Sequence, residues 1–283
     1  MLILLDLAGH AVKLGMQPWG LERMFGLAAA TWRLMLVMLS LIGMPDMARS
    51  QAPQLQAPAQ PAKETWLIAC DSFFPPYNWL DQGKVTGMDA EIVTALVRRA
   101  GAEPRFEPAP WNRVQQLLEL GQIDAAFQFV GRPDRFEKFH MIGPIRHGET
   151  VFAVPRDGMP DWDTLEDFKP FSIGVVQGYT YGTAFDQATY LRKESTAGDN
   201  RLLLRMLAAK RVDAVIGDRV TLAYLAQQEG LRDNIRFLTK PFDRVARYIA
   251  VPKAKAAIAE RLQRALDAMN SDGSITRIML NWE

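Results

Sequence analysis

The chain has 283 residues, 48% hydrophobic and 23% charged, which is enough to bury a core in one large or two small domains. It has 33 basic and 32 acidic side chains, and the net charge of +1 gives no field that would attract nucleic acid or an anionic membrane. A single cysteine, Cys70, excludes an internal disulfide, and the three histidines are scattered. Because nucleotide-binding, zinc-protease and serine-hydrolase motifs are also absent from the sequence, we expect no cofactor and no metal.

The N-terminal region has the features of an export signal. An apolar run of eleven residues, Leu34–Met44, is followed by a polar stretch that ends in small residues suited to signal-peptidase cleavage after Ala52. We therefore expect residues 1–52 to be a cleaved signal peptide whose true start is Met16 or Met24. An uncleaved membrane anchor is the alternative, but the unbroken apolar run is shorter than the ~20 residues that a bilayer span needs.

A linker and a segment rich in aromatic residues come next. Residues 53–64 are dominated by proline, glutamine and alanine, which is typical of a flexible or partly extended linker. The apolar run TWLIAC (65–70) predicts a strand, and DSFFPPYNWLD (71–81) follows it with four aromatic rings and two prolines. The prolines exclude a helix or an interior strand, so these rings either close the end of a core or line a pocket.

Short apolar strands then alternate with amphipathic helices, and the pattern occurs twice. This repetition predicts an α/β protein with two similar lobes, each built on a mostly parallel sheet with flanking helices. Glycines such as Gly101 and Gly121 follow the first two helices and supply their stops. The predicted elements are helices over 88–100, 112–120, 202–209 and 256–269, and strands over 124–130, 150–155, 171–176, 213–218 and 247–252.

Two similar strands suggest how the lobes connect. TVFAVP (150–155) and RYIAVP (247–252) would form a two-stranded hinge if one leaves the first lobe and the other returns to it. The first lobe would then comprise 65–153 plus 248–283, and the second lobe 154–247. A ligand would bind in the cleft between them, at the carboxyl ends of the strands.

Five motifs in order resemble family 3 of the bacterial extracellular solute-binding proteins, the periplasmic receptors of polar amino-acid ABC transporters. The resemblance covers residues 65–283 and implies the two-lobed, type II-like periplasmic binding protein fold. Each motif alone is weak, but their shared order and spacing are specific. The motifs are FFPPYNWLDQGKVTGMDAEIVTALVRRAG (73–101), PWNRVQQLLELGQIDAAF (110–127), RPDR (132–135) followed by Pro144, IGVVQGYTYG (173–182) and VDAVIGD (212–218).

The resemblance implies a site for an amino acid. Arg135 falls on the family's arginine that grips the α-carboxylate of the ligand, and a guanidinium offers that group two parallel N–H bonds. Thr180 falls on a second carboxylate ligand, and Asp218 on the acceptor for the α-ammonium group. Taken alone, these residues have ordinary alternatives: a solvated surface arginine, and helix caps for Thr180 and Asp218.

Aromatic rings are expected to hold the ligand side chain. The resemblance puts Phe74 and Trp111 on opposite sides of that side chain, whereas Tyr77 and Trp79 are expected to be packing or rim residues. Asp71 falls where some family members place a carboxylate for a basic side chain.

The chain also departs from the family pattern. Gln128 stands in a strand end that is usually rich in serine, and we include it among the ligand-binding residues. Arg132 replaces a usual threonine, and together with Arg113 it favours an acidic ligand side chain, whereas Asp71 favours a basic one. The sequence leaves this conflict open.

The expected function is a non-catalytic periplasmic receptor, not an enzyme. It would bind a small zwitterionic or carboxylate ligand, an amino acid first, and deliver it as a monomer to the membrane permease of an ABC transporter. One alternative is a periplasmic dehydratase of the prephenate or arogenate type on the same fold, with Asp71 as general acid. Another is a sensor that works without a transporter.

Overall fold

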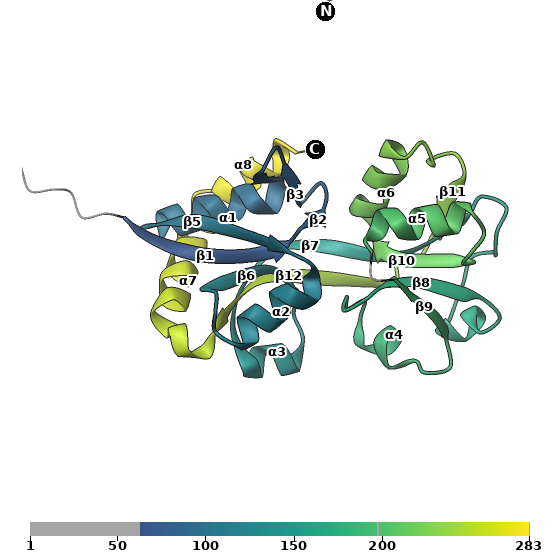
Figure 1. Ribbon diagram of the computed structural model, residues 1–283, viewed down its shortest axis with the longest axis horizontal. Coiled ribbons are helices and arrows are strands. Elements are labelled where there is room, and N and C mark those ends of the chain that lie inside the picture. The colour runs from purple at the N-terminus through teal and green to yellow at the C-terminus, as the bar shows by residue number, and fades with distance from the viewer. Residues whose placement is uncertain (1–62, 197, 283) are drawn as a thin grey trace, which may run out of the picture. The chain divides into compact units, whose positions relative to one another are not determined.

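The computed structural model describes residues 63–196 and 198–282 (Figure 1). The predicted signal peptide, 1–52, and the predicted linker up to residue 62 lie outside the described residues. None of the described helices combines the length and apolarity needed to cross a bilayer. The strands are β1 (Glu64–Asp71), β2 (Phe73–Phe74), β3 (Asn78–Asp81), β4 (Lys84–Thr86), β5 (Ala102–Ala109), β6 (Ala125–Val130), β7 (Phe139–Pro155), β8 (Ser172–Val176), β9 (Arg192–Thr196), β10 (Ala214–Asp218), β11 (Ile235–Phe237) and β12 (Asp243–Pro252). The helices are α1 (Met88–Arg99), α2 (Trp111–Glu119), α3 (Pro133–Lys138), α4 (Thr183–Gln187), α5 (Asn200–Ala208), α6 (Arg219–Gln228), α7 (Ala256–Ser271) and α8 (Ser274–Leu280).

Two parallel groups of strands are joined through β7 and β12. The strand order is β5-β1-β6-β12-β7-β10-β8-β9, with β11 added against β7. The β1 strand is parallel to β5 and β6, and β8 is parallel to β9 and β10, whereas β7 and β12 pair antiparallel with each other and with their neighbours. Figure 1 shows both long strands running from one lobe into the other. The predicted two-lobed α/β fold is confirmed.

The connection between the lobes differs in detail from the predicted hinge. TVFAVP (150–155) is the end of β7 and pairs with β10 and β11, so it belongs to the second lobe's part of the sheet. RYIAVP (247–252) is the end of β12 and pairs with β6 and the start of β7. These two segments therefore do not pair with each other along their lengths. The lobes are connected where 146–150 of β7 pairs with 243–247 of β12. Both β7 and β12 are longer than their apolar ends, and the polar residues in the middle of β7 and at the start of β12 gave no strand signal.

Each lobe is a three-layer sandwich, because alternate residues of its strands enter different cores. In β1, Ile68 and Cys70 pack with α1 and α7, whereas Ala69 faces the opposite cluster with α2. In the second lobe, Phe152 and Ile216 pack against the face that carries α4, and the intervening residues pack against α5 and α6. This period of two is the expected consequence of a pleated strand covered on both faces.

The aromatic segment is anchored to the start of α1 by its backbone. The carbonyl of Pro76 accepts a hydrogen bond from Met88 N at 3.1 Å, and the carbonyl of Tyr77 accepts one from Asp89 N at 2.8 Å. These bonds satisfy helix N–H groups that have no partner within the helix. Gly87 precedes α1 at φ 117°, and a Cβ there would lie 2.5 Å from Tyr77 O. The close approach thus requires glycine and fixes where the aromatic rings lie.

Gly87→Ala is expected to lower the free energy of unfolding by more than ~2 kcal/mol, because both its backbone conformation and the approach of Tyr77 are incompatible with a side chain. Gly83→Ala is the matched control: Gly83 also has positive φ, at 82°, but nothing lies within 4 Å of its Cβ position. It should cost only ~1 kcal/mol. Urea unfolding of both variants measures the difference, and equal losses would contradict the importance of the close approach.

Candidate functional site

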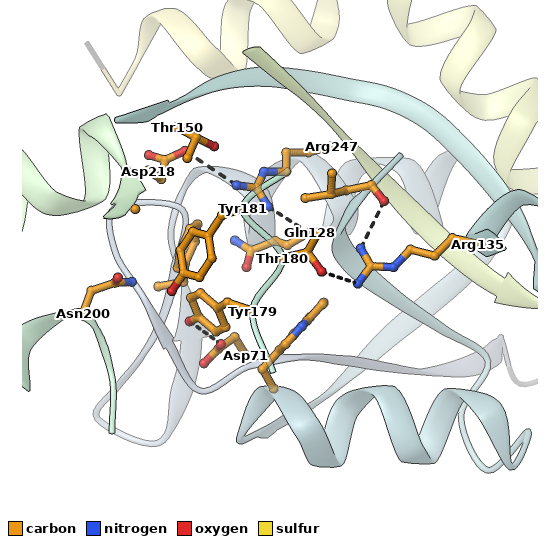
Figure 2. A pocket seen from close by; sticks show the side chains of 14 residues that line it. Asp71, Gln128, Arg135, Thr150, Tyr179, Thr180, Tyr181, Asn200, Asp218 and Arg247 are labelled. Carbon is orange, nitrogen blue, oxygen red and sulfur yellow. Dashed lines mark hydrogen bonds and ion pairs between the residues drawn. The ribbon is translucent and has the colours of Figure 1, made fainter. Parts of the chain in front are cut away.

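One pocket between the two lobes collects all seven sequence-predicted site residues. The first lobe contributes Asp71, Phe74, Trp111, Gln128 and Arg135, and the second contributes Thr180 and Asp218. Figure 2 shows the polar side chains turned toward a common space. The remaining lining residues, which the sequence did not single out as ligand-binding, are Val130, Thr150, Tyr179, Tyr181, Asn200, Gly217 and Arg247.

Arg135 lines this pocket and is buried, so it is not a solvated surface arginine. It lies on the short helix α3, is 6% exposed, and its guanidinium is 5.0 Å from the centre of the Phe129 ring. Its Nη1 donates to Val130 O at 3.1 Å and its Nη2 donates to Thr180 Oγ1 at 3.3 Å. Burial lowers the pKa of Arg135 to about 10. Among the described residues it forms no ion pair within 4.0 Å, and the more distant carboxylates of Asp134 and Asp186 only partly oppose the fall in its pKa.

Asp218 has one oxygen in a helix cap and one facing the pocket. Its Oδ1 accepts the N–H groups of Val220 at 3.1 Å and Thr221 at 3.2 Å, which begin α6. Its Oδ2 is buried without a hydrogen-bond partner among the described residues. The nearest cation is Arg247, whose Nη2 lies 3.9 Å away. The cap that the sequence offered as an alternative is therefore present, and it leaves half of the carboxylate available.

Asp71 and Tyr179 connect the lobes across the pocket. Asp71 ends β1, and its Oδ2 accepts a hydrogen bond from the Tyr179 hydroxyl at 2.6 Å while its Oδ1 accepts from Phe73 N at 3.0 Å. Burial raises the pKa of Asp71 to about 6, although the bond from Tyr179 opposes the shift and the charge of Asp199 adds to it. Burial and the Asp71 charge raise the pKa of Tyr179 above its usual range. Tyr179 is therefore the neutral donor of this bond.

Gln128 reaches the pocket because the backbone of β6 is irregular there. Gln128 has φ 72°, in the left-handed region, and the pairing of β12 with β6 shifts register at the same level. Phe127 packs in the core with α1, and Phe129, two residues later, packs in the core with α2, so the alternation of the strand is reset at Gln128. Bulges of this kind commonly redirect side chains beside binding sites, and strained residues persist where the surroundings hold them.

A buried ion pair supports Gln128 from behind. Asp89 Oδ2 accepts from Gln128 Nε2 at 3.2 Å, and Asp89 Oδ1 accepts from Arg146 Nε at 2.7 Å, with both charged side chains at most 1% exposed. The Arg146 guanidinium lies 3.4 Å from the centre of the Tyr77 ring. Removing one member of such a pair would leave a buried charge unpaired, so the pair holds the pocket floor in one arrangement.

The aromatic residues divide as expected between pocket and packing. Phe74 and Trp111 line the pocket. Tyr77 is buried and stacks on Phe74 with ring centres 5.7 Å apart. Trp79 is not among the lining residues, and its ring centre lies 6.4 Å from that of Tyr224 of the second lobe. Pocket and packing thus share the segment, which answers why it holds so many rings.

Arg247 and Asn200 are the main pocket residues that sequence reasoning missed. Arg247 stands before an apolar strand run, where a charge is usually a solvated end residue, and Asn200 begins a helix, where it is usually a surface residue. Neither position carries a local signal of burial. No cluster of three His, Cys, Asp or Glu side chains suited to a metal ion occurs within 63–196 and 198–282.

The raised pKa of Asp71 predicts a pH dependence of stability. A carboxyl whose pKa rises from 3.8 to about 6 on folding binds protons more tightly in the native state than in the unfolded state. Its contribution to the free energy of unfolding is therefore complete below about pH 4 and is lost as the pH rises through about 6. Relative to Asp71→Asn, the wild-type free energy of unfolding should fall by up to about 3 kcal/mol across this window.

Denaturant unfolding at several pH values measures this difference. Asp81→Asn, at an exposed carboxyl on β3, gives the baseline for the same comparison. A wild-type stability that rose relative to Asp71→Asn between about pH 4 and 7 would contradict the assignment.

Named relatives of the chain are binding proteins. The L-cystine-binding protein TcyJ of Escherichia coli (strain K12) is 24% identical over 220 residues, which cover 77% of this chain and 82% of TcyJ. A probable histidine-binding protein of Neisseria gonorrhoeae is 24% identical over 238 residues, covering 81% and 86% of the two chains.

Solved structures share the fold at low identity. A histidine kinase sensor domain similar to periplasmic binding proteins has a TM-score of 0.72 at 21% identity and covers 78% of this chain and 96% of its own. An ancestral arginine-binding protein bound to arginine has a TM-score of 0.68 at 22% identity, with 78% and 98% covered. The ancestral amino acid-binding protein AncCDT-1, a precursor of cyclohexadienyl dehydratase, has a TM-score of 0.65 at 20% identity, with 77% and 94% covered.

The family comparison covers nearly all of the described residues. The model of the bacterial extracellular solute-binding proteins, family 3, matches residues 67–283, which include most of β1, every element from β2 to α8 and the whole pocket lining. The chain belongs to family 3 of the bacterial extracellular solute-binding proteins.

Proposed function

We propose that the protein is a periplasmic receptor for a small ligand that bears a carboxylate, an amino acid first and a simple carboxylate second. The observation that carries this proposal is the pairing of a guanidinium from one lobe with a carboxylate from the other in one buried pocket. Arg135 and Asp218 lie on opposite sides of that pocket (Figure 2). A zwitterion can meet both charges at once.

The proposed contacts use side chains that lack a carboxylate or hydrogen-bond partner among the described residues. Arg135 and the Thr180 hydroxyl would bind the ligand carboxylate, since the guanidinium has no carboxylate partner among the described residues. The free Oδ2 of Asp218 would accept from the ammonium group. Phe74 and Trp111 would pack on the ligand side chain, with Asp71 and Gln128 bounding it.

Binding would be coupled to movement of the lobes about the crossing strands. The hydrogen bonds of Arg135 with Thr180 and of Asp71 with Tyr179 join the lobes around the pocket. A ligand that touches both lobes binds the closed arrangement more tightly than the open one and shifts the population toward it. We place the hinge in 146–150 and 243–247, where β7 and β12 pair between the lobes.

The names of the relatives support an amino-acid ligand and a transporter partner. One relative is named as an L-cystine-binding protein and another as a probable histidine-binding protein. We therefore propose that the closed receptor, acting as a monomer in the periplasm after removal of residues 1–52, delivers its ligand to the permease of an ABC transporter.

A dehydratase acting on prephenate or arogenate is the second candidate. Asp71 is a buried pocket carboxyl with a pKa of about 6, which suits a general acid near neutral pH. A solved structure of this fold is named as a precursor of cyclohexadienyl dehydratase. Incubating the protein with arogenate and measuring phenylalanine tests this candidate, and the receptor proposal expects none. A stand-alone sensor is a further form of the receptor, since a sensor domain shares the fold.

Arg135→Ala is expected to weaken binding of carboxylate ligands by about 10-fold to 100-fold or more, because each charge-assisted hydrogen bond contributes ~1.5–3 kcal/mol. Isothermal titration calorimetry of the full chain with a panel of amino acids measures the change. Arg105→Ala, at an exposed arginine on β5, is the matched control and should bind as the wild type does.

A thermal melt of each variant separates lost binding from lost folding. Undiminished affinity of a folded Arg135→Ala variant would overturn the assignment of Arg135. Failure of every amino acid and small carboxylate to bind the wild type would overturn the receptor proposal itself.

A further inference from the structure

The pocket contains a second guanidinium, that of Arg247. Its side chain is 11% exposed, and it lies on β12 where the pairings with β6 and β7 both shift register nearby. Nη1 donates to Gln128 O at 3.3 Å, and Nη2 lies 3.9 Å from Asp218 Oδ2. Figure 2 shows Arg247 between Asp218 and Gln128, so it faces the space that a ligand bound to Arg135 and Asp218 would enter.

The positive charges of the pocket are incompletely matched by its own carboxylates. Arg135 has no ion pair among the described residues, and Arg247 has only the long contact to Asp218. Asp71 is engaged on both oxygens, by Tyr179 and by the backbone of Phe73. Two guanidiniums buried together are costly unless anions lie near both, because each is removed from water and repels the other.

Arg146 does not add to the positive charge that lacks a carboxylate partner. It is the third buried guanidinium of the region, and its own carboxylate partner, Asp89, lies at 2.7 Å. The pair is neutral as a whole. Burial lowers the pKa of Arg247 and the nearby charge of Arg146 lowers it further, whereas the carboxylates of Asp218 and Asp89 oppose the shift.

The second lobe presents unpaired polar atoms of both kinds, acceptors and a donor, to the same pocket. Asp218 Oδ2 and both polar atoms of the Asn200 side chain are buried without hydrogen-bond partners among the described residues, and Asn200 is 1% exposed. Arg247 Nε is also buried without a partner. Buried polar groups are normally paired, so these atoms indicate what a ligand must supply: donors for Asp218 Oδ2 and Asn200 Oδ1, and acceptors for Asn200 Nδ2 and Arg247 Nε.

We propose that the ligand is an acidic amino acid, whose side-chain carboxylate is bound by Arg247 while Arg135 binds its α-carboxylate and Asp218 with Asn200 binds its ammonium group. The inference rests on the proposed receptor function and names its ligand class. It also decides between the opposed charges of the pocket lining: Asp71 is occupied by Tyr179, whereas the lining residue Arg247 has an unpaired donor, Nε.

The test compares ligands that differ only in the second acid group. Full-length wild-type protein is titrated by calorimetry with glutamate against glutamine and with aspartate against asparagine. At least one acidic member should bind about 10-fold or more tightly than its amide, as expected for one charge-assisted contact. Arginine, whose side chain would meet Arg247, should bind more weakly still.

Variants of β12 assign the preference to one residue. Arg247→Gln should reduce the acid-to-amide ratio by about 10-fold or more, and Arg247→Lys should restore part of it. Arg244→Gln is the matched control, because Arg244 lies on the same strand with its side chain 79% exposed, and it should leave the ratio unchanged.

The outcomes separate this inference from the proposed function. If amides or arginine bind the wild type as tightly as the acids, the ligand class is wrong and the receptor function stands. An acid preference that survives in Arg247→Gln removes Arg247 from the proposal. If no amino acid binds, the ligand class is wrong, and the receptor function is overturned as well only if small carboxylates also fail to bind. The wild-type ratios need no variant, so they decide the ligand class even if Arg247→Gln does not fold.

Discussion

The removal of charged side chains from water between two lobes is the constraint on which the rest of the structure depends. Arg135, Asp218 and Arg247 are all nearly inaccessible to solvent, and none makes a short ion pair with another described residue. In a domain interior such groups would be exchanged for apolar ones or tightly paired, as Asp89 and Arg146 are. Their partial pairing is therefore what distinguishes a binding site from a core in this protein.

The scaffold explains how these charges can be held in place. Strands β1 and β10 end in Asp71 and Asp218, and each strand is buried on both faces by helices packed on a continuous sheet. The carboxyl ends of strands in such layers leave their last side chains uncovered by the helices. The glycine contact before α1 and the irregular Gln128 backbone complete the floor. Strands and helices thus carry Asp71, Asp218 and Arg135, whereas Tyr179 and Thr180 lie in the loop between β8 and α4.

The order of elements and the pocket residues of the family motifs could be predicted from the sequence, because both depend on local patterns. Apolar periodicity located α1, α2, α7 and the buried strands, and the RPDR segment located Arg135. The hinge pairing could not be predicted, since the polar middle of β7 and the polar start of β12 carry no strand pattern. Arg247 was missed for a related reason: its burial comes from residues distant in sequence, such as Gln128 and Asp218.

The location of Arg247 on a crossing strand has a mechanical consequence. A point on the axis of a rotation is displaced least, and β12 runs along the connection between the lobes (Figure 1). If the lobes swing apart about this connection, Arg135 and Asp218 separate from each other, whereas Arg247 stays close to both. An anionic group bound to Arg247 would keep this contact while the lobes move. Ligand binding could therefore begin at Arg247 and be completed by Arg135 and Asp218 when the lobes close.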